Sequence, residues 1–138
     1  MRVIAGLLKQ RRLISPKGLV TRPTSSRLRE AVFNLCRGEV EGALFLDLFA
    51  GSGAMGIEAL SRGAKHASFV DKERIAIEAI RTNIKQFGLE EKAQIICGDA
   101  FRFLKQCQQR FDLVYLDPPY SMDPSTLLRD ASFLAPGG

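Results

Sequence analysis

The residues best suited to chemistry stand in one tetrapeptide, made up of Asp117, Pro118, Pro119 and Tyr120. The carboxylate of Asp117 and the carbonyl group of Pro118 are acceptors that can hold the N–H groups of an exocyclic amine, so that its lone pair turns toward an incoming group. The two prolines restrict the backbone and fix these acceptors in space. Tyr120 can stack on a planar base that has been swung out of its helix. The alternative is a rigid turn after a strand, with a half-buried tyrosine.

A glycine-rich segment lies between an apolar stretch and a helical one, with the pattern G-x-G-x-x-G at Gly51, Gly53 and Gly56. Such glycines let the backbone approach a ligand at the N-terminus of a helix. Asp71 follows the first glycine by twenty residues, which is the spacing of an acid that binds ribose hydroxyl groups. A dinucleotide such as NAD fits this pattern, and a tight turn without a ligand is a further alternative.

Two other aspartates help to choose between these ligands. Asp47 lies four residues before the first glycine, where it would repel a pyrophosphate but attract the cationic amino group and sulfonium of S-adenosyl-L-methionine. Asp99 can accept from the amino group of adenine, and the N–H of Ala100 can donate to a ring nitrogen. Each aspartate could instead cap a turn or a helix. Because open α/β sheets bind ligands at the carboxyl ends of their strands, their shared location favours S-adenosyl-L-methionine. Methyl transfer from a sulfonium is direct, so no metal is needed.

The elements that must position these residues alternate along the chain. Short apolar segments, typical of strands buried on both faces, lie at 43–49, 67–71, 93–97 and 111–116. Helical patterns separate them, at 54–62, from Glu73 to Phe87, and at 101–108. In the second helix, one face carries Ile77, Ile80, Ile84 and Phe87, and Gly88 stands where a C-terminal cap belongs. This alternation predicts an α/β fold.

A further helix is expected after Pro23, ending at Gly38. Its apolar stripe consists of Leu28, Ala31, Val32, Leu35 and Cys36, and we expect this stripe to pack on the sheet. The opposite face would then offer Arg27 and Arg29 to solvent or to a phosphate backbone. Residues 2–22 alternate loosely, which suggests a small hairpin or a mobile arm.

Positive charge is concentrated in the first 40 residues, which carry nine Lys and Arg against two Asp and Glu, a balance of +7. Residues 41–138 carry eleven against thirteen, a balance of −2. The sequence thus divides into a basic extension, 1–40, and a core, 41–138. Such asymmetry indicates a polyanionic partner, although a solvated basic arm is the simpler alternative.

The bulk composition, 46% hydrophobic and 25% charged over 138 residues, is that of one soluble globular domain. No segment has the roughly 18 successive apolar residues of a membrane span, and we expect a cytoplasmic monomer. Cys36, Cys97 and Cys107 lack disulfide or zinc spacing and are expected to be reduced, half-buried thiols. Residues 134–138 are typical of a turn that leads into another strand, so we expect a truncated chain. A partner chain that supplies the remaining strands is the alternative.

In this order, the segments DLFAGSGAMG, FVD, GDA and DPPY resemble class I methyltransferases that act on amino nitrogens of nucleic acids. RVIAG and RPTSSRLREAVFN (22–34) resemble more narrowly the bacterial family that methylates a guanine N2 of small-subunit (16S) ribosomal RNA. The resemblance implies a Rossmann-like sheet of order 3-2-1-4, of which this sequence holds the first four strands, with later strands missing. It also implies that the basic extension, including Arg22, Arg27 and Arg29, grips RNA on the ribosomal subunit or its assembly intermediate.

The same resemblance places the catalytic tetrapeptide at 117–120. It places cofactor binding on Asp47 to Gly56, Asp71, Asp99 and Ala100. Three alternatives stay open at this point. The chain could methylate adenine N6 or cytosine N4 of DNA, it could be a nicotinamide-dependent oxidoreductase, or it could be a non-catalytic RNA-binding or assembly module.

Overall fold

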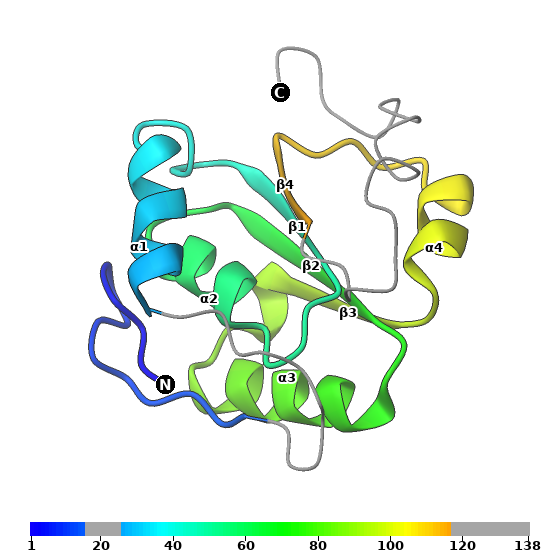
Figure 1. Cartoon of the computed structure of the whole chain (residues 1–138), viewed down its shortest axis with the longest axis horizontal. Coiled ribbons are helices and arrows are strands. Elements are labelled where there is room, and N and C mark those ends of the chain that lie inside the picture. Colours follow the sequence, from blue (N-terminus) through cyan, green and yellow to red (C-terminus); the bar gives the residue numbers. More distant parts are fainter. Residues whose placement is uncertain (16–25, 117–138) are drawn as a thin grey trace.

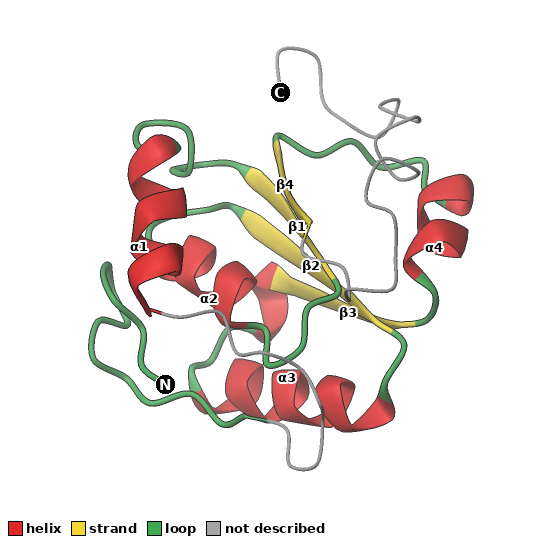
Figure 2. Cartoon of the chain, in the orientation of Figure 1, coloured by secondary structure: helices red, strands yellow, loops and turns green. Residues whose placement is uncertain are grey.

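The computed structural model of the chain describes residues 1–15 and 26–116 (Figure 1). Helices and strands alternate through the second range, as Figure 2 shows. In chain order they are α1 (Ser26–Leu35), β1 (Leu44–Leu48), α2 (Ala54–Ser61), β2 (His66–Asp71), α3 (Arg74–Gln86), the 3-10 turn η1 (Glu90–Lys92), β3 (Ala93–Cys97), α4 (Ala100–Gln106) and β4 (Leu113–Leu116). The predicted strands and helices are confirmed, with ends shifted by one to three residues.

The strands form one parallel sheet in the order β3-β2-β1-β4. The pairing register places Asp47 of β1 opposite Phe69 of β2, and Asp71 of β2 opposite Cys97 of β3. From β1 to β3 the strands are added toward one edge of the sheet, and the chain then crosses back past two strands to place β4 on the other side of β1. The direction in which strands are added therefore reverses beside β1. Open parallel sheets bind ligands at such a reversal, beyond the carboxyl ends of the strands. The expected order 3-2-1-4 is therefore confirmed.

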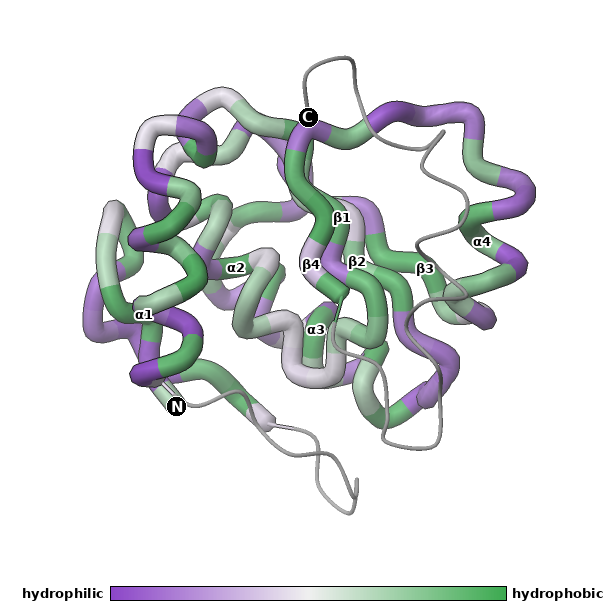
Figure 3. Tube along the Cα trace, turned by 45° about the horizontal axis from the view of Figure 1, so that its top comes forward, coloured by the Kyte–Doolittle hydropathy of each residue, from purple (hydrophilic) through white to green (hydrophobic). Residues whose placement is uncertain are grey.

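Both faces of the sheet are covered, because successive side chains of a strand point to opposite sides. On one face, Phe45 of β1 and Phe69 of β2 belong to a buried cluster with residues of α1, α2 and α3. On the other face, Leu46 and Leu48 pack in a second cluster with Leu104 of α4. Figure 3 shows hydrophobic residues concentrated along the strands between these layers. This two-sided burial explains why β1 is a nearly continuous apolar run, whereas β3 has Gln94 and Cys97 exposed.

The apolar stripe predicted for α1 is only partly confirmed, because Val32 and Cys36 pack against the core cluster but the helix also buries residues outside the stripe. Its buried residues are Arg29 and Phe33, whereas Leu28 and Leu35 of the expected stripe are 49% and 88% exposed. The ring of Phe33 stacks against that of Phe45 in β1, with centroids 6.1 Å apart. The hydrophobic pattern failed here because a buried arginine, held by an ion pair from another helix, takes a position that the pattern assigned to solvent.

The described part of residues 2–22 turns back on itself in a hairpin-like way, in line with the first of the two expectations, and residues 16–22 lie outside the described residues. The N–H of Val3 donates to the carbonyl of Arg11 at 2.9 Å, and a single antiparallel bridge joins Arg2 and Arg12. Val3 and Leu13 are buried in the same cluster as Phe45. Among the described helices, none is both long and apolar enough to span a membrane.

Candidate cofactor site

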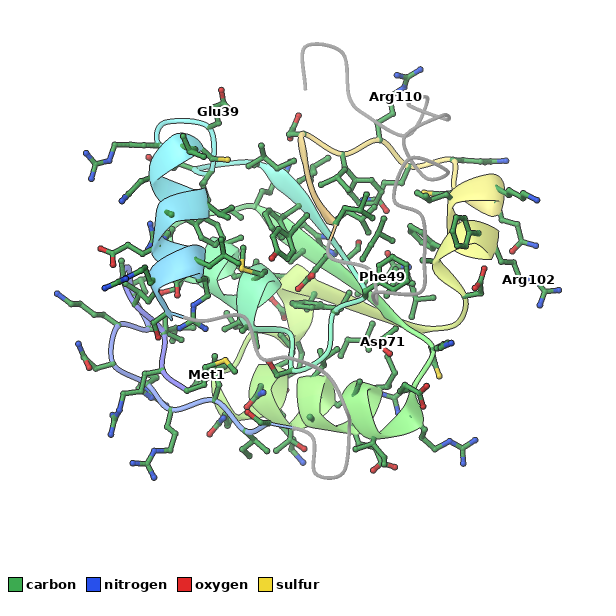
Figure 4. All side chains as sticks on the ribbon, viewed as in Figure 1. Met1, Glu39, Phe49, Asp71, Arg102 and Arg110 are labelled. Atoms are coloured by element: carbon green, nitrogen blue, oxygen red, sulfur yellow. The ribbon has the colours of Figure 1, made fainter. Side chains whose placement is uncertain are left out.

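The candidate site lies at the carboxyl ends of β1, β2 and β3, where the glycine-rich loop and three aspartates come together. Because these strands are parallel neighbours, Asp47, Asp71 and Asp99 occupy or follow the same ends of the sheet. Figure 4 labels Asp71 and Phe49 at this edge. The sheet thus brings together residues that are 52 positions apart in the sequence, from 47 to 99.

The three glycines of the loop have different tasks. Gly51 and Gly53 have φ angles of +59° and +81°, a left-handed conformation that only glycine adopts at little cost. A Cβ atom added to Gly51 would meet nothing within 4 Å, so the space beside it is open. A Cβ atom on Gly56 would lie 2.3 Å from Cε1 of Phe69. Gly51 therefore leaves room for a ligand, whereas Gly56 allows α2 to pack closely on β2.

Asp47 is buried, with 1% of its surface exposed, and its Oδ2 accepts a hydrogen bond of 3.0 Å from the N–H of Gly56. This carboxylate therefore satisfies one of the free amides in the first turn of α2 and adds favourable charge at that helix end. The turn-capping role, the alternative raised from the sequence, is thus observed. An attraction between Asp47 and the cationic end of a cofactor stays a prediction.

Asp71 connects the end of β2 to the glycine-rich loop. Its Oδ2 accepts from the N–H of Gly51 at 2.9 Å, and its Oδ1 accepts from the N–H of Glu73 at 2.9 Å. Each carboxylate oxygen can accept a further hydrogen bond, and the side chain is only half-buried. The carboxylate can therefore hold the loop and still accept from the hydroxyl groups of a ribose.

Asp99 is the N-cap of α4, and its Oδ2 accepts from the N–H of Arg102 at 2.9 Å. A pocket of about 420 Å³ lies beside it, between the end of β3 and α4. Its walls are Ile96, Cys97, Gly98, Asp99, Arg102, Phe103, Gln106 and Cys107. Ala100 is buried. The capping role of Asp99 is observed, and the pocket next to it has apolar and polar walls suited to a planar base.

Phe49 is a feature of the site that the sequence did not reveal. It stands between β1 and the loop with φ +57°, in the left-handed region that a bulky residue rarely adopts. Such a conformation costs of order 1 kcal/mol and recurs at ligand-binding sites. The backbone therefore turns sharply at the end of β1 before Gly51 begins the loop.

The other predicted site residues have different outcomes. The tetrapeptide Asp117 to Tyr120 and Arg22 lie outside the described residues. Arg27 is exposed on α1, as expected. Arg29 is fully buried, so the expectation that it faces solvent or a phosphate is wrong. Of the three cysteines, Cys36 and Cys107 are half-buried free thiols, whereas Cys97 is exposed, contrary to expectation.

The buried Arg29 belongs to an ion cluster centred on Glu58 of α2. Glu58 is fully buried, and its Oε1 lies 3.6 Å from Nε of Arg29. Oε1 also accepts from the backbone N–H of Ile4 at 2.8 Å. Oε2 accepts from Nε of Arg62 at 2.8 Å and from the backbone N–H of Ala5 at 3.0 Å. Burial lowers the pKa of Arg29, the charge of Glu58 opposes this, and Arg62 adds to it. The cluster ties the basic N-terminal segment to the helix that follows the glycine-rich loop.

Comparison with solved structures shows the class of protein that this sheet and loop define. A candidate methyltransferase of Escherichia coli, yhhF, has the same fold with a TM-score of 0.86 at 36% sequence identity, over 98% of this chain and 75% of that one. The described part is therefore a Rossmann-like methyltransferase fold, as expected. More particularly, the chain belongs to the family described as Conserved hypothetical protein 95, which matches residues 1–137.

The sequence is also similar to the sequences of proteins that are named as rRNA methyltransferases. A candidate rRNA methyltransferase of Bacillus subtilis, YlbH, is 45% identical over 123 residues, which are 87% of this chain and 67% of that protein. Ribosomal RNA small subunit methyltransferase D of Haemophilus influenzae is 38% identical over 125 residues, which are 87% of this chain and 64% of that protein. The chain thus spans about two thirds of the length of these relatives.

Proposed function

We propose that this protein transfers a methyl group from S-adenosyl-L-methionine to the exocyclic N2 amine of a guanine in small-subunit (16S) ribosomal RNA, in the cytoplasm. One structural observation carries the proposal. The half-buried carboxylate of Asp71, bonded to the N–H of Gly51, stands at the end of β2 in a methyltransferase sheet. The Haemophilus influenzae relative is named for a ribosomal RNA substrate, which supports the choice of RNA.

The residues present fit this cofactor. The space beside Gly51 is open, and Asp71 has capacity to accept from two ribose hydroxyl groups. The pocket next to Asp99 offers a carboxylate to the adenine amino group. Asp47 contributes negative charge behind the loop, near the end at which a cationic methionyl group would bind. When bound, the cofactor supplies an activated methyl group on its sulfonium.

The chain's own residues then hold the acceptor amine. Asp117 and the carbonyl of Pro118 would accept its N–H groups, and Tyr120 would stack on the extruded guanine. Holding the amine in this geometry exposes its lone pair, so positioning supplies most of the catalysis. The methylated nitrogen then loses its proton to solvent.

We assign the RNA contact to the basic extension 1–40, with Arg22 and the exposed Arg27 among its contacts, and no longer with the buried Arg29. Charge reversal at Arg27 should weaken RNA binding. It should also make the binding constant less sensitive to salt, so that the slope of log binding constant against log salt concentration becomes shallower by about one unit. Reversal of the exposed Lys65, which follows α2, is the matched control. An equal loss of affinity in both variants would show that Arg27 makes no specific contact.

The cofactor assignment is tested by substituting Asp71 with Asn. An amide retains one acceptor oxygen, so it can keep the bond from the N–H of Gly51 or that from the N–H of Glu73, but not both, and it loses the charge that attracts ribose hydroxyl groups. We expect the affinity for S-adenosylhomocysteine, measured by calorimetry, to fall about tenfold or more. Asp112→Asn is the matched control, because Asp112 also accepts a backbone N–H, that of Leu44, at the opposite end of the sheet. Tighter binding of NAD than of S-adenosylhomocysteine would instead identify an oxidoreductase.

The chemistry is tested with labelled S-adenosyl-L-methionine and immature small ribosomal subunits. The intact protein should label the RNA, and Asp117→Ala should abolish the label while cofactor affinity changes little. Duplex DNA that outcompetes RNA would indicate a DNA amino methyltransferase. RNA binding without transfer, by a protein of full family length, would indicate an assembly module.

A further inference from the structure

The side chain of Asn83 joins the glycine-rich loop to the N-terminal segment, although it belongs to neither. Asn83 lies on α3 and is fully buried. Its Nδ2 donates to the carbonyl of Ser52, within the loop, at 3.2 Å. The same side chain pairs with Ile14 of the N-terminal segment in both directions. A single amide therefore touches two parts of the chain that are proposed to bind different ligands.

The hydrogen-bonding capacity of this amide is fully used. Its Oδ1 accepts from the N–H of Ile14 at 2.8 Å and from Nε2 of Gln86 at 2.9 Å. Its Nδ2 donates to the carbonyl of Ile14 at 2.9 Å and to that of Ser52. A carboxamide has two donors and two acceptor lone pairs, so no bond remains for water or for another residue. A shift of Ile14 would therefore leave a buried polar atom without a partner and disturb the bond to Ser52.

The N-terminal segment 1–15 is held on the body at several separate points. Val3 and Leu13 are buried in the core, Glu58 accepts from the backbone of the segment, and the N–H of Leu7 donates to the carbonyl of Ser61. Asn83 differs from these anchors because it also bonds to the glycine-rich loop. Ile14 is 45% exposed, and local opening around it gives a seated and a released form that Asn83 can bias.

The surface of the segment is strongly basic. Exposed cations on residues 1–15 are Arg2, Lys9, Arg11 and Arg12. Arg11 lies over the ring of Phe87, at the end of α3, with its guanidinium carbon 5.2 Å from the ring centroid. The orientation of this basic surface consequently depends on how the segment is seated against α3. A polyanion that binds these cations would favour one of the two states.

From these contacts we infer that Asn83 is a positioning residue that couples the two proposed ligands, cofactor at the glycine-rich loop and RNA on the basic segment. A cofactor that orders the loop stabilises the carbonyl of Ser52, which stabilises the amide of Asn83 and, through it, the seated form of Ile14. Thermodynamic linkage makes the effect reciprocal, so bound RNA raises cofactor affinity by the same factor. The inference rests on the proposed function for the identity of the ligands, but its first test needs neither RNA nor catalysis.

The first test is amide hydrogen exchange with S-adenosylhomocysteine as the probe. In the wild-type protein, saturating probe should slow exchange of the Ile14 N–H by about fivefold or more, the lower end of common coupling factors. In Asn83→Ala, the probe should bind but leave the exchange of residues 13–15 unchanged. Thr82→Ala is the matched control, because Thr82 is the exposed neighbour whose hydroxyl bonds only to the carbonyl of Glu78 in its own helix. The control should keep the full protection.

A second variant covers the case in which Asn83→Ala does not fold. Ile14→Pro removes the backbone N–H that donates to Oδ1 of Asn83. The side chain of Ile14 is 45% exposed, so its replacement leaves the core intact. With small-subunit ribosomal RNA present, S-adenosylhomocysteine should bind the wild type about fivefold more tightly than without RNA, and Ile14→Pro should lose this gain. A purely structural role for Asn83 would lower stability without removing a ligand-dependent difference.

The outcomes separate the two proposals. Binding of the probe with no change in exchange at Ile14, or an equal change in Asn83→Ala and the wild type, overturns the coupling and leaves the proposed function intact. Failure of the wild-type protein to bind S-adenosylhomocysteine overturns both. Loss of protection in Asn83→Ala but not in Thr82→Ala confirms the coupling.

Discussion

Replacing Glu58 with glutamine should destabilise the protein strongly, although the substitution changes only charge and donor count. The fully buried carboxylate accepts three hydrogen bonds, from Ile4, Ala5 and Arg62, and faces Nε of Arg29. In glutamine, one of the two oxygens becomes an NH2 group. Whichever oxygen is replaced, the new group meets a backbone N–H and an arginine, so at least one buried donor loses its acceptor.

The magnitude follows from what remains buried. Arg29 is completely buried and loses its counter-charge, whereas Arg62 is 17% exposed and regains part of its hydration. Removing one partner of a buried ion pair costs about 3–5 kcal/mol. The partial exposure of Arg62 places the expected loss of unfolding free energy near the lower end, about 3 kcal/mol. That is a large share of the 5–15 kcal/mol typical of a domain.

The assay is equilibrium unfolding in urea, followed by far-ultraviolet circular dichroism, for Glu58→Gln and for a matched control. Glu78→Gln, on the exposed face of α3, should change the unfolding free energy by less than about 0.5 kcal/mol. Adding Arg29→Met to Glu58→Gln should recover part of the loss, because the uncompensated charge is gone. A loss for Glu58→Gln no larger than that of the control, or strict additivity in the double variant, would refute the argument.

Three further outcomes are expected. Gly56→Ala should destabilise the protein by about 1–3 kcal/mol in the same urea assay despite the better helix propensity of alanine, because its Cβ would lie 2.3 Å from the ring of Phe69; equal or greater stability would contradict the close packing. Burial lowers the pKa of His66, so the unfolded chain takes up this proton first as pH falls, and the protein loses stability over the window that opens near pH 6.5, the ordinary pKa of histidine. His66→Gln should lose less over that window, and an identical pH profile would count against it. Burial raises the pKa of the Cys36 thiol, so Cys36 should react with a disulfide reagent at pH 8 more slowly than the exposed Cys97, as mass spectrometry of the labelled peptides would show.

Local pattern was sufficient for the parallel sheet and its helices. Strands that are buried on both faces are largely apolar, so β1, with four of its five residues buried, stands out from its surroundings. Helix α3 could also be predicted from the sequence, because Ile77, Ile80 and Ile84 recur at helical spacing, and all three are buried in the structure. The glycine-rich loop was found because a left-handed turn demands glycine at Gly51 and Gly53. Each of these features depends on residues that are close in the sequence.

Features that rest on distant partners were not available from the sequence. The hydrophobic pattern of α1 assigned Arg29 to solvent, because its counter-charge, Glu58, comes from another helix. The left-handed Phe49 carries no sequence signal, since the surrounding fold enforces that conformation against its own preference.

The sequence by itself determined the α/β class, the strand and helix positions, and the spacing of glycines and acids that indicates a nucleoside cofactor. Only the tertiary structure decided how those parts are connected. Asn83 has no unusual neighbours in the sequence, yet in the fold it bonds to Ser52 and to Ile14, 31 and 69 residues away. The physical reason is that periodicity and backbone preference act over a few residues, whereas the partner of a buried polar group is chosen by the packing of the whole chain.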